Sequence, residues 1–296
     1  MSGTASPDGG LDDATVTFMS VRPRLFGIAY RVLGSANDAE DILQEAWLRW
    51  QNYDRSTVDD PAAFLATTTT RLAINLAQSA RMRHEAYIGP WLPEPVDTSR
   101  DPGLGAERGE ALEFAVLLLL EQLTPTERAA YVLREAFDYP YSQIADIIQA
   151  TEASTRQLVS RARKHLAAGR PSTPAPRAEQ RKLLDAFIAA AQAGDLARLE
   201  GLFAADVVSY SDGGGKVRAS IHPVHGRETV AKFIHAFAPR FWTGVTVSAI
   251  EANGQEAVSV TKDGAPVALV SLITGADGIE QILWVMNPDK LGLISA

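Results

Sequence analysis

The side chains best suited to chemistry in this 296-residue sequence are basic, and they gather in two short runs. Residues 81–84 read RMRH, and residues 156–165 read RQLVSRARKH with no acidic residue among them. Guanidinium and ammonium groups bind phosphate oxygens, so these runs favour a nucleic-acid partner although the whole chain carries a net charge of −8. The chain has no cysteine, which excludes disulfides, thiolate zinc sites and thiol redox chemistry.

The second basic run lies in a segment whose layout predicts a helix-turn-helix. Residues 141–166 read YSQIADIIQATEASTRQLVSRARKHL, with a short helix from Ser142, a turn at 149–151 and a second helix capped by Thr151. Apolar residues of the second helix recur at helical spacing and leave a donor-rich face suited to a major groove. The DNA-binding candidates on this helix are Ser154, Arg156, Gln157, Ser160, Arg161, Arg163 and Lys164.

Two observations weigh against this interpretation. A basic face on a plain three-helix bundle would show the same pattern. In addition, such turns often hold Gly where Gln149 stands, because a left-handed residue there costs a side chain with a β-carbon about 1 kcal/mol.

The helix-turn-helix belongs to a helical first half, and the pattern changes in the last third of the chain. Thr124, Pro125 and Glu127 predict a capping box at one helix start. Near the end, β-rich segments separated by NGQ, DGAP and ADG predict an antiparallel meander. We therefore expect six parts: a disordered tail (1–15), a helical domain (16–84), a linker (85–109), a second helical domain (110–168), a second linker (169–178) and an α+β domain (179–296).

The first linker contains an unusual segment, EAYIGPWLPEP, at residues 85–95. Its three prolines cannot continue a helix. Large aromatic side chains are uncommon in a loop that only spans a distance, so a docking role is expected. The longest apolar run, near residues 114–120, is too short to span a bilayer, and the N-terminus has no features of a signal peptide. We expect a cytoplasmic protein.

Taken together, these residues resemble a sigma factor of the extracytoplasmic-function group. NDAEDILQEAWLRW (37–50) is similar to the helix with which that group grips RNA polymerase, and residues 141–166 are similar to the helix-turn-helix that reads the upstream promoter element. WLPEP (91–95), DGGGK (212–216) and NPDKL (287–291) resemble three marks of the SigJ-like subgroup, which carries a C-terminal SnoaL-like domain.

The resemblance implies roles for two sets of residues in the first helical domain. The polymerase-binding candidates are Asp38, Glu40, Asp41, Gln44, Glu45 and Arg49. From the charge pattern alone they would be a solvated acidic face. The candidates for the downstream promoter element are Arg71, Asn75, Ser79, Arg81 and Arg83. Many members of the group carry Asp where Ser79 stands, in a run richer in Arg, so a weaker charge-driven affinity is expected here.

The three motifs are expected to meet, which would dock the linker on the chain's own C-terminal domain. The candidates for this contact are Trp91, Leu92, Pro93, Glu94 and Pro95 in the linker, Asp212, Gly213, Gly214, Gly215 and Lys216 in DGGGK, and Asn287, Pro288, Asp289, Lys290 and Leu291 in NPDKL. The alternative is a loop that folds back on its own domain.

The C-terminal part resembles a SnoaL-like cone, in which a curved antiparallel sheet wraps on helices around a pocket. Many relatives are enzymes that use Asp and His in acid–base catalysis, and the candidates here are Asp212, His222, His225 and Asp289. No spacing defines a site, so we expect no catalytic residues, no cofactor and no metal. A small ligand in the cone stays an open question.

These expectations combine into one functional hypothesis with two alternatives. The protein would be a sigma factor that binds core RNA polymerase and promoter DNA and is regulated in cis by its C-terminal domain. The first alternative is a ligand-sensing helix-turn-helix regulator that acts without polymerase, which leaves the first helical domain and WLPEP unexplained. The second is a SnoaL-type enzyme tethered to DNA.

Overall fold

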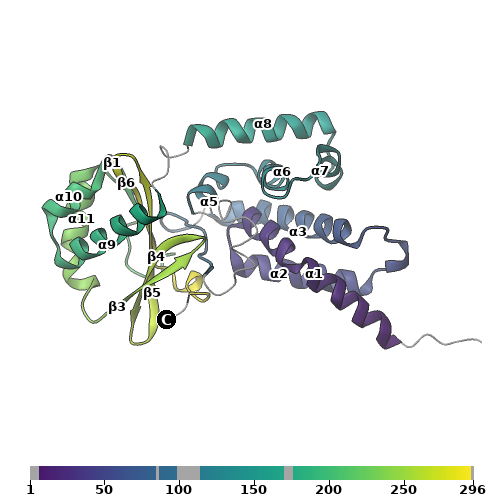
Figure 1. Ribbon diagram of the computed structural model, residues 1–296, viewed down its shortest axis with the longest axis horizontal. Helices are drawn as coiled ribbons and strands as arrows, with labels where there is room; N and C mark the ends of the chain where they lie inside the picture. Colours follow the sequence, from purple (N-terminus) through teal and green to yellow (C-terminus); the bar gives the residue numbers. More distant parts are fainter. Residues whose placement is uncertain (1–6, 85–86, 99–113, 170–175, 295–296) are drawn as a thin grey trace, which may run out of the picture. The chain divides into compact units, whose positions relative to one another are not determined.

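The computed structural model describes residues 7–84, 87–98, 114–169 and 176–294 (Figure 1). The chain divides into two compact units. The first consists of Met1–Met82 with Leu119–Ala168, and the second of Arg83–Leu118 with Gly169–Ala296. Among the described residues, no helix has both the length and the hydropathy needed to cross a bilayer.

The first unit begins with three long helices, α1 (Pro7–Leu33), α2 (Ala36–Asn52) and α3 (Pro61–His84), with a 3-10 turn η1 (Arg55–Thr57) before α3. Ser35 caps α2, because its side chain accepts a hydrogen bond from the Asp38 N–H at 3.1 Å. The large buried side chains include Tyr30 and Trp50, which form the core between α1 and α2 together with smaller apolar residues.

The expectation of a disordered tail over residues 1–15 is wrong for residues 7–15, which are helical in α1. Tertiary contacts with α2 hold this segment in a helix. Ala14 is 1% exposed, and its carbonyl accepts a hydrogen bond from Trp50 Nε1 at 3.2 Å. Phe18 also packs on Trp47, with 5.1 Å between the ring centroids. Residues 1–6 lie outside the described residues.

Four more helices follow among the described residues: α5 (Phe114–Leu120), α6 (Pro125–Glu135), α7 (Tyr141–Ile148) and α8 (Glu152–Gly169). The predicted capping box at α6 is confirmed, since Thr124 and Glu127 bond reciprocally through side chain and backbone. The predicted helix-turn-helix is also confirmed as α7 and α8. Gln149 does adopt the left-handed conformation, with φ 56° and ψ 48°, so the mismatch noted in the sequence is real.

The second unit contains helices and one sheet. The helices are α9 (Arg177–Ala193), α10 (Leu196–Leu202) and α11 (Arg227–Phe241), followed near the end of the chain by the 3-10 turn η3 (Pro288–Lys290). The strands are β1 (Phe203–Asp212), β2 (Val224–His225), β3 (Thr246–Ala252), β4 (Gln255–Lys262), β5 (Ala265–Gly275) and β6 (Gly278–Val285).

The sheet order is β2-β1-β6-β5-β4-β3, and β3 to β6 form the predicted antiparallel meander. In contrast to a fully antiparallel sheet, β1 pairs in parallel with β6, so that Asp212 lies opposite Val285. Parallel neighbours end at the same edge of a sheet. The segments that follow β1 and β6 therefore leave the sheet side by side.

Each face of the sheet has its own apolar core. One core lies under α9, α10 and α11, and it includes Phe187, Phe203 and Trp284 (Figure 1). Strand alternation turns Leu283 and Val285 to the opposite face. That face is covered by Leu92 of the linker, by Phe114, and by Leu291 and Ile294 at the end of the chain. The linker therefore completes the second core of the C-terminal domain.

Candidate nucleic-acid, polymerase and linker-docking sites

The helix-turn-helix presents one open face. All seven candidates on α8, Ser154 to Lys164, are exposed, whereas Thr155, Val159, Ala162 and Leu166 are buried beneath them. Thr151 starts the helix by accepting a hydrogen bond from the Ser154 N–H at 3.1 Å. Residues 154, 157, 161 and 164 recur at helical spacing, so their donors point to one side of the helix.

Three arginines of this face already have carboxylate partners. Arg156 pairs with Glu152 one turn earlier, Arg161 lies 3.3 Å from Glu127, and Arg163 lies 2.6 Å from Glu135. The hydrogen bond to Glu135 raises the pKa of Arg163 above its ordinary value, so this group stays cationic. Exposed pairs of this kind contribute only about 0–1 kcal/mol, so phosphate groups can displace them at little cost.

The candidates for the downstream promoter element lie along α3, but their environments differ. Asn75 and Ser79 are exposed. Arg71 instead donates from Nε to the Ile147 carbonyl at 3.0 Å and from its terminal nitrogen to the Asp146 carbonyl at 2.8 Å. These carbonyls end α7, so Arg71 is bound to the helix-turn-helix. The side chains of Arg81 and Arg83 lie outside the described ones.

Other arginines that we did not predict also connect the two helical parts of the first unit. Arg128 is 6% exposed, and it donates to the Val32 carbonyl at 2.9 Å. Arg24 donates to the Phe137 carbonyl at 3.1 Å and stacks over the Tyr139 ring at 5.0 Å. A lone basic residue on the apolar side of an amphipathic helix, as at Arg128, is the one sequence signal for this interface.

The polymerase-binding candidates line the side of α2 opposite its buried residues. Asp41, Gln44 and Arg49 are exposed, and the other three candidates, Asp38, Glu40 and Glu45, are half-buried. Two exposed apolar side chains, Leu48 and Tyr53, lie beside them and border a shallow hollow. Charged groups around exposed apolar side chains are typical of protein interfaces.

The parallel pairing of β1 with β6 brings the DGGGK and NPDKL motifs together, and the WLPEP segment joins them. Asp212 is fully buried and lies at the centre of the contact. Its Oδ2 accepts hydrogen bonds from the Leu92 N–H at 2.9 Å and from Lys290 Nζ at 2.7 Å. Lys290 Nζ also donates to the Leu92 carbonyl at 2.5 Å. Both backbone groups of Leu92 are thus bound by one buried ion pair.

Aromatic side chains of the linker surround this ion pair. Lys290 Nζ lies 4.1 Å from the centroid of the Trp91 ring and 5.1 Å from that of Tyr87. The Tyr87 hydroxyl donates to Asp212 Oδ1 at 2.6 Å and accepts from Asn287 Nδ2 at 2.8 Å. Burial, together with the bond to Asp212, raises the pKa of Tyr87 well above its ordinary value, which keeps the hydroxyl protonated as a donor.

The glycine run permits this close approach. Gly214 has φ +59°, and a β-carbon added there would lie 2.4 Å from Asn287 Nδ2 and 3.0 Å from the Tyr87 hydroxyl. Lys216, an exposed member of the motif, lies 2.5 Å from Asp289 of NPDKL. The outer edge of the contact is therefore polar and open to solvent, whereas its centre is buried.

A second attachment, which we did not predict, holds the end of the described linker. The Val96 N–H donates to Asn253 Oδ1 at 3.0 Å, and the Asn253 N–H donates to the Val96 carbonyl at 2.9 Å. Thr98 bonds to Glu251, and Asp97 pairs with Ala252. Asn253 belongs to the NGQ turn, which the sequence identified only as a hairpin. Tyr87 is the other docking residue that we did not predict. Its signal in the sequence was an aromatic residue within EAYIGPWLPEP.

The residues weighed for acid–base catalysis have other environments. Both carboxylate oxygens of Asp212 are occupied by Tyr87, Leu92 and Lys290. His222 and His225 are exposed. Among the described residues, no cluster of three or more His, Cys, Asp or Glu side chains could hold a metal ion.

Comparisons with known proteins agree with this architecture. Three family models match: sigma-70 region 2 over residues 17–83, sigma-70 region 4 over residues 113–166, and a SnoaL-like domain over residues 184–278. Region 2 followed by region 4 defines a sigma factor of RNA polymerase. The chain belongs to the extracytoplasmic function (ECF) RNA polymerase sigma factors, and it carries a SnoaL-like C-terminal domain.

Individual relatives narrow the class further. The chain is 35% identical over 287 residues to the ECF RNA polymerase sigma factor SigJ of Mycobacterium tuberculosis, covering 92% of this chain and 91% of the relative. It is 27% identical over 268 residues to SigG of the same species, covering 81% and 70% of the two chains. The crystal structure of SigJ superposes with a TM-score of 0.76 at 31% identity, covering 94% of this chain and 98% of that one.

These findings confirm the resemblance seen in the motifs, the fold class and the function as an ECF sigma factor in transcription initiation. Sigma factors act with core RNA polymerase and promoter DNA. None of the findings favours a regulator that works without polymerase or a DNA-tethered enzyme.

Proposed function

We propose that the chain binds core polymerase through the exposed side of α2 and reads two promoter elements through α3 and α8, in the cytoplasm where polymerase acts. The C-terminal domain is a regulator in cis and not an enzyme. It sets the activity by binding the linker between the two DNA-reading parts. The observation that carries this proposal is the buried ion pair of Asp212 and Lys290 around the backbone of Leu92.

The linker is suited to this contact because its backbone is already extended. Proline restricts both itself and the residue before it to extended conformations, so Pro93 and Pro95 leave Leu92 and Glu94 little entropy to lose on binding. Leu92 adds a buried apolar contact and is 1% exposed. Recognition therefore combines backbone hydrogen bonds, one apolar anchor and the Trp91 ring over Lys290.

The ion pair also couples linker binding to the folding of the domain. Separating the linker removes the Leu92 partners and opens the pair to water, whereas removing one charge leaves the other buried alone, at a cost of about 3–5 kcal/mol. The contact therefore has two distinct states, a bound linker over a buried ion pair and a released linker with the pair open to water. In the family the linker threads near the active-site cleft of polymerase, so a linker held on the C-terminal domain is withheld from polymerase.

The test weakens the linker contact without altering the fold of the domain. Asn253→Gly removes the acceptor for the Val96 N–H and keeps a turn whose φ of 55° suits glycine. The matched control is Asp263→Gly, which changes the equivalent position of the β4–β5 turn, where φ is 52°. We expect Asn253→Gly to raise promoter-dependent transcription by core polymerase several-fold, and Asp263→Gly to leave it unchanged. Equal output from both variants would contradict regulation through the linker.

A further inference from the structure

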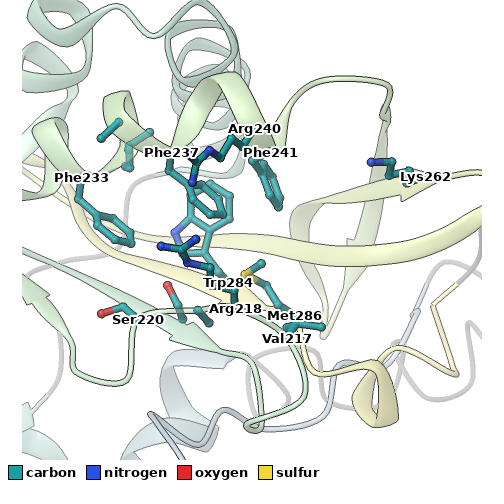
Figure 2. Close-up of a pocket in the computed structure, with 14 residues that line it drawn as sticks. Val217, Arg218, Ser220, Phe233, Phe237, Arg240, Phe241, Lys262, Trp284 and Met286 are labelled. Atoms are coloured by element: carbon teal, nitrogen blue, oxygen red, sulfur yellow. The ribbon is translucent and has the colours of Figure 1, made fainter.

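A cavity of about 720 Å³ opens in the second unit between α11 and the sheet (Figure 2). Its walls are aromatic. Phe233, Phe237 and Phe241 recur every four residues along α11, and Trp284 of β6 faces them. Phe241 meets Trp284 edge-on with 5.6 Å between ring centroids, and Phe237 stacks on Phe241 at 5.0 Å. Both the volume and the lining are those of a site for a drug-sized molecule.

The charged groups at this cavity all have one sign. Arg218, Arg240 and Lys262 line it, and no Asp or Glu does. In the part of the chain that the structure describes, these three side chains have neither a hydrogen-bond partner nor an ion-pair partner. Figure 2 shows Arg240 of α11 and Arg218 of the loop after β1 reaching toward each other across the aromatic rings, with Lys262 at the far edge.

This combination selects one class of ligand. Two guanidinium groups in the lining favour a carboxylate, sulfonate or phosphate, because charge-assisted hydrogen bonds to Arg are strong and directional. The aromatic walls favour a flat apolar body. A neutral molecule would leave the arginines unpaired, and a cation would be repelled.

The cavity and the linker contact share the ends of β1 and β6. Ser211 and Met286 line the cavity, and the next residues along the chain, Asp212 and Asn287, bind the linker. The Met286 N–H donates to the Asp212 carbonyl at 2.8 Å, which joins the two strand ends. A molecule that binds this cavity more tightly when the linker holds the two strand ends stabilises the linker-bound state.

We propose that this cavity binds a small organic anion with an aromatic body, and that binding holds the linker on the C-terminal domain. The second half rests on the proposed function above. A regulator in cis with this property reports the concentration of that anion to polymerase, because the occupied form withholds the linker.

The first experiment measures binding to the full chain with two dyes of one skeleton, 8-anilinonaphthalene-1-sulfonate and its uncharged counterpart N-phenyl-1-naphthylamine. We expect the double variant Arg218→Gln and Arg240→Gln to bind the sulfonate about tenfold more weakly and the neutral dye unchanged. The control variant, Arg198→Gln with Arg227→Gln, removes two exposed charges outside the cavity and should bind the sulfonate as the wild type does. Equal sulfonate binding by all three proteins, or no binding by the wild type, would contradict the proposed anion site. Neither result would bear on the proposed regulation through the linker.

The second experiment measures hydrogen exchange of residues 87–98 with and without the sulfonate dye. The Leu92 and Val96 N–H groups are bonded to Asp212 and Asn253, so a held linker exchanges more slowly. We expect slower exchange with the dye in the wild type and no change in the double variant. Saturable binding with unchanged or faster linker exchange overturns the coupling.

Discussion

Replacing Lys290 by Met removes one charge from a buried pair and keeps the length of the side chain. Asp212, with no exposed surface, then keeps Tyr87 and the Leu92 N–H as partners but loses its cation. Breaking a buried pair in this way costs about 3–5 kcal/mol. For a unit of this size the loss lowers the melting temperature by roughly 6–20 °C.

The assay is calorimetric unfolding of the full chain, with Lys216→Met as the matched control. Lys216 also pairs with a carboxylate of the neighbouring motif, Asp289, but both side chains are more than half exposed. We expect a cost of about 0–1 kcal/mol there. The double variant Asp212→Asn with Lys290→Met should lose less stability than the sum of its single variants, by about 1–3 kcal/mol. Equal losses from Lys290→Met and Lys216→Met would refute the reasoning.

Three further predictions follow from other parts of the chain. Gln149→Gly stabilises the first unit to chemical unfolding by about 1 kcal/mol because the residue is left-handed, whereas Gln149→Ala gives no gain. Tyr87 has a raised pKa, so the unfolded chain loses this proton first, and stability falls as the pH rises above about 10. Tyr87→Phe should flatten that fall, and an unchanged pH profile contradicts the assignment. Removing NPDKL (residues 287–291) releases the linker and should raise transcription, whereas deleting everything after Pro176 also removes a domain that would orient the two DNA-reading parts and should lower it; equal increases would rule out that orienting role.

The elements that the sequence predicted are those whose causes are local. The capping box at Thr124 and Glu127 and the turns of the meander each depend on a few adjacent residues. The left-handed residue in the helix-turn-helix was recognised for the same reason, since the turn geometry imposes it on Gln149. Each of these features can be read from one short stretch.

The features that the sequence did not predict depend on distant partners. The start of α1 is ordered by Trp50, 36 residues away from Ala14. The parallel pairing of β1 with β6 joins two segments that are far apart in the sequence. No local pattern distinguishes this pairing from an antiparallel one. Arg71 was expected at DNA because of the resemblance to the family, and its bond to the end of α7 appears only in three dimensions.

The linker-docking site was predicted in part. Its three motifs were recognised by resemblance, and the structure brings Leu92, Asp212 and Lys290 into contact. The roles of Tyr87 and Asn253 were not foreseen, because a hydroxyl and a turn amide are common surface groups. Tyr87 and Asn253 become part of the docking site because the linker is buried there and they hydrogen-bond across the contact.

The most direct test of the account is co-purification of the full chain with core RNA polymerase. Wild type is compared with the charge reversal Asp41→Lys and Glu45→Lys on α2, and with a control reversal at two exposed acids of the second unit, Asp206→Lys and Asp277→Lys. We predict that the wild type and the control bind core polymerase and that the α2 reversal does not. Failure of the wild type to bind, both as the full chain and as a form ending at Pro176, would contradict the central claim.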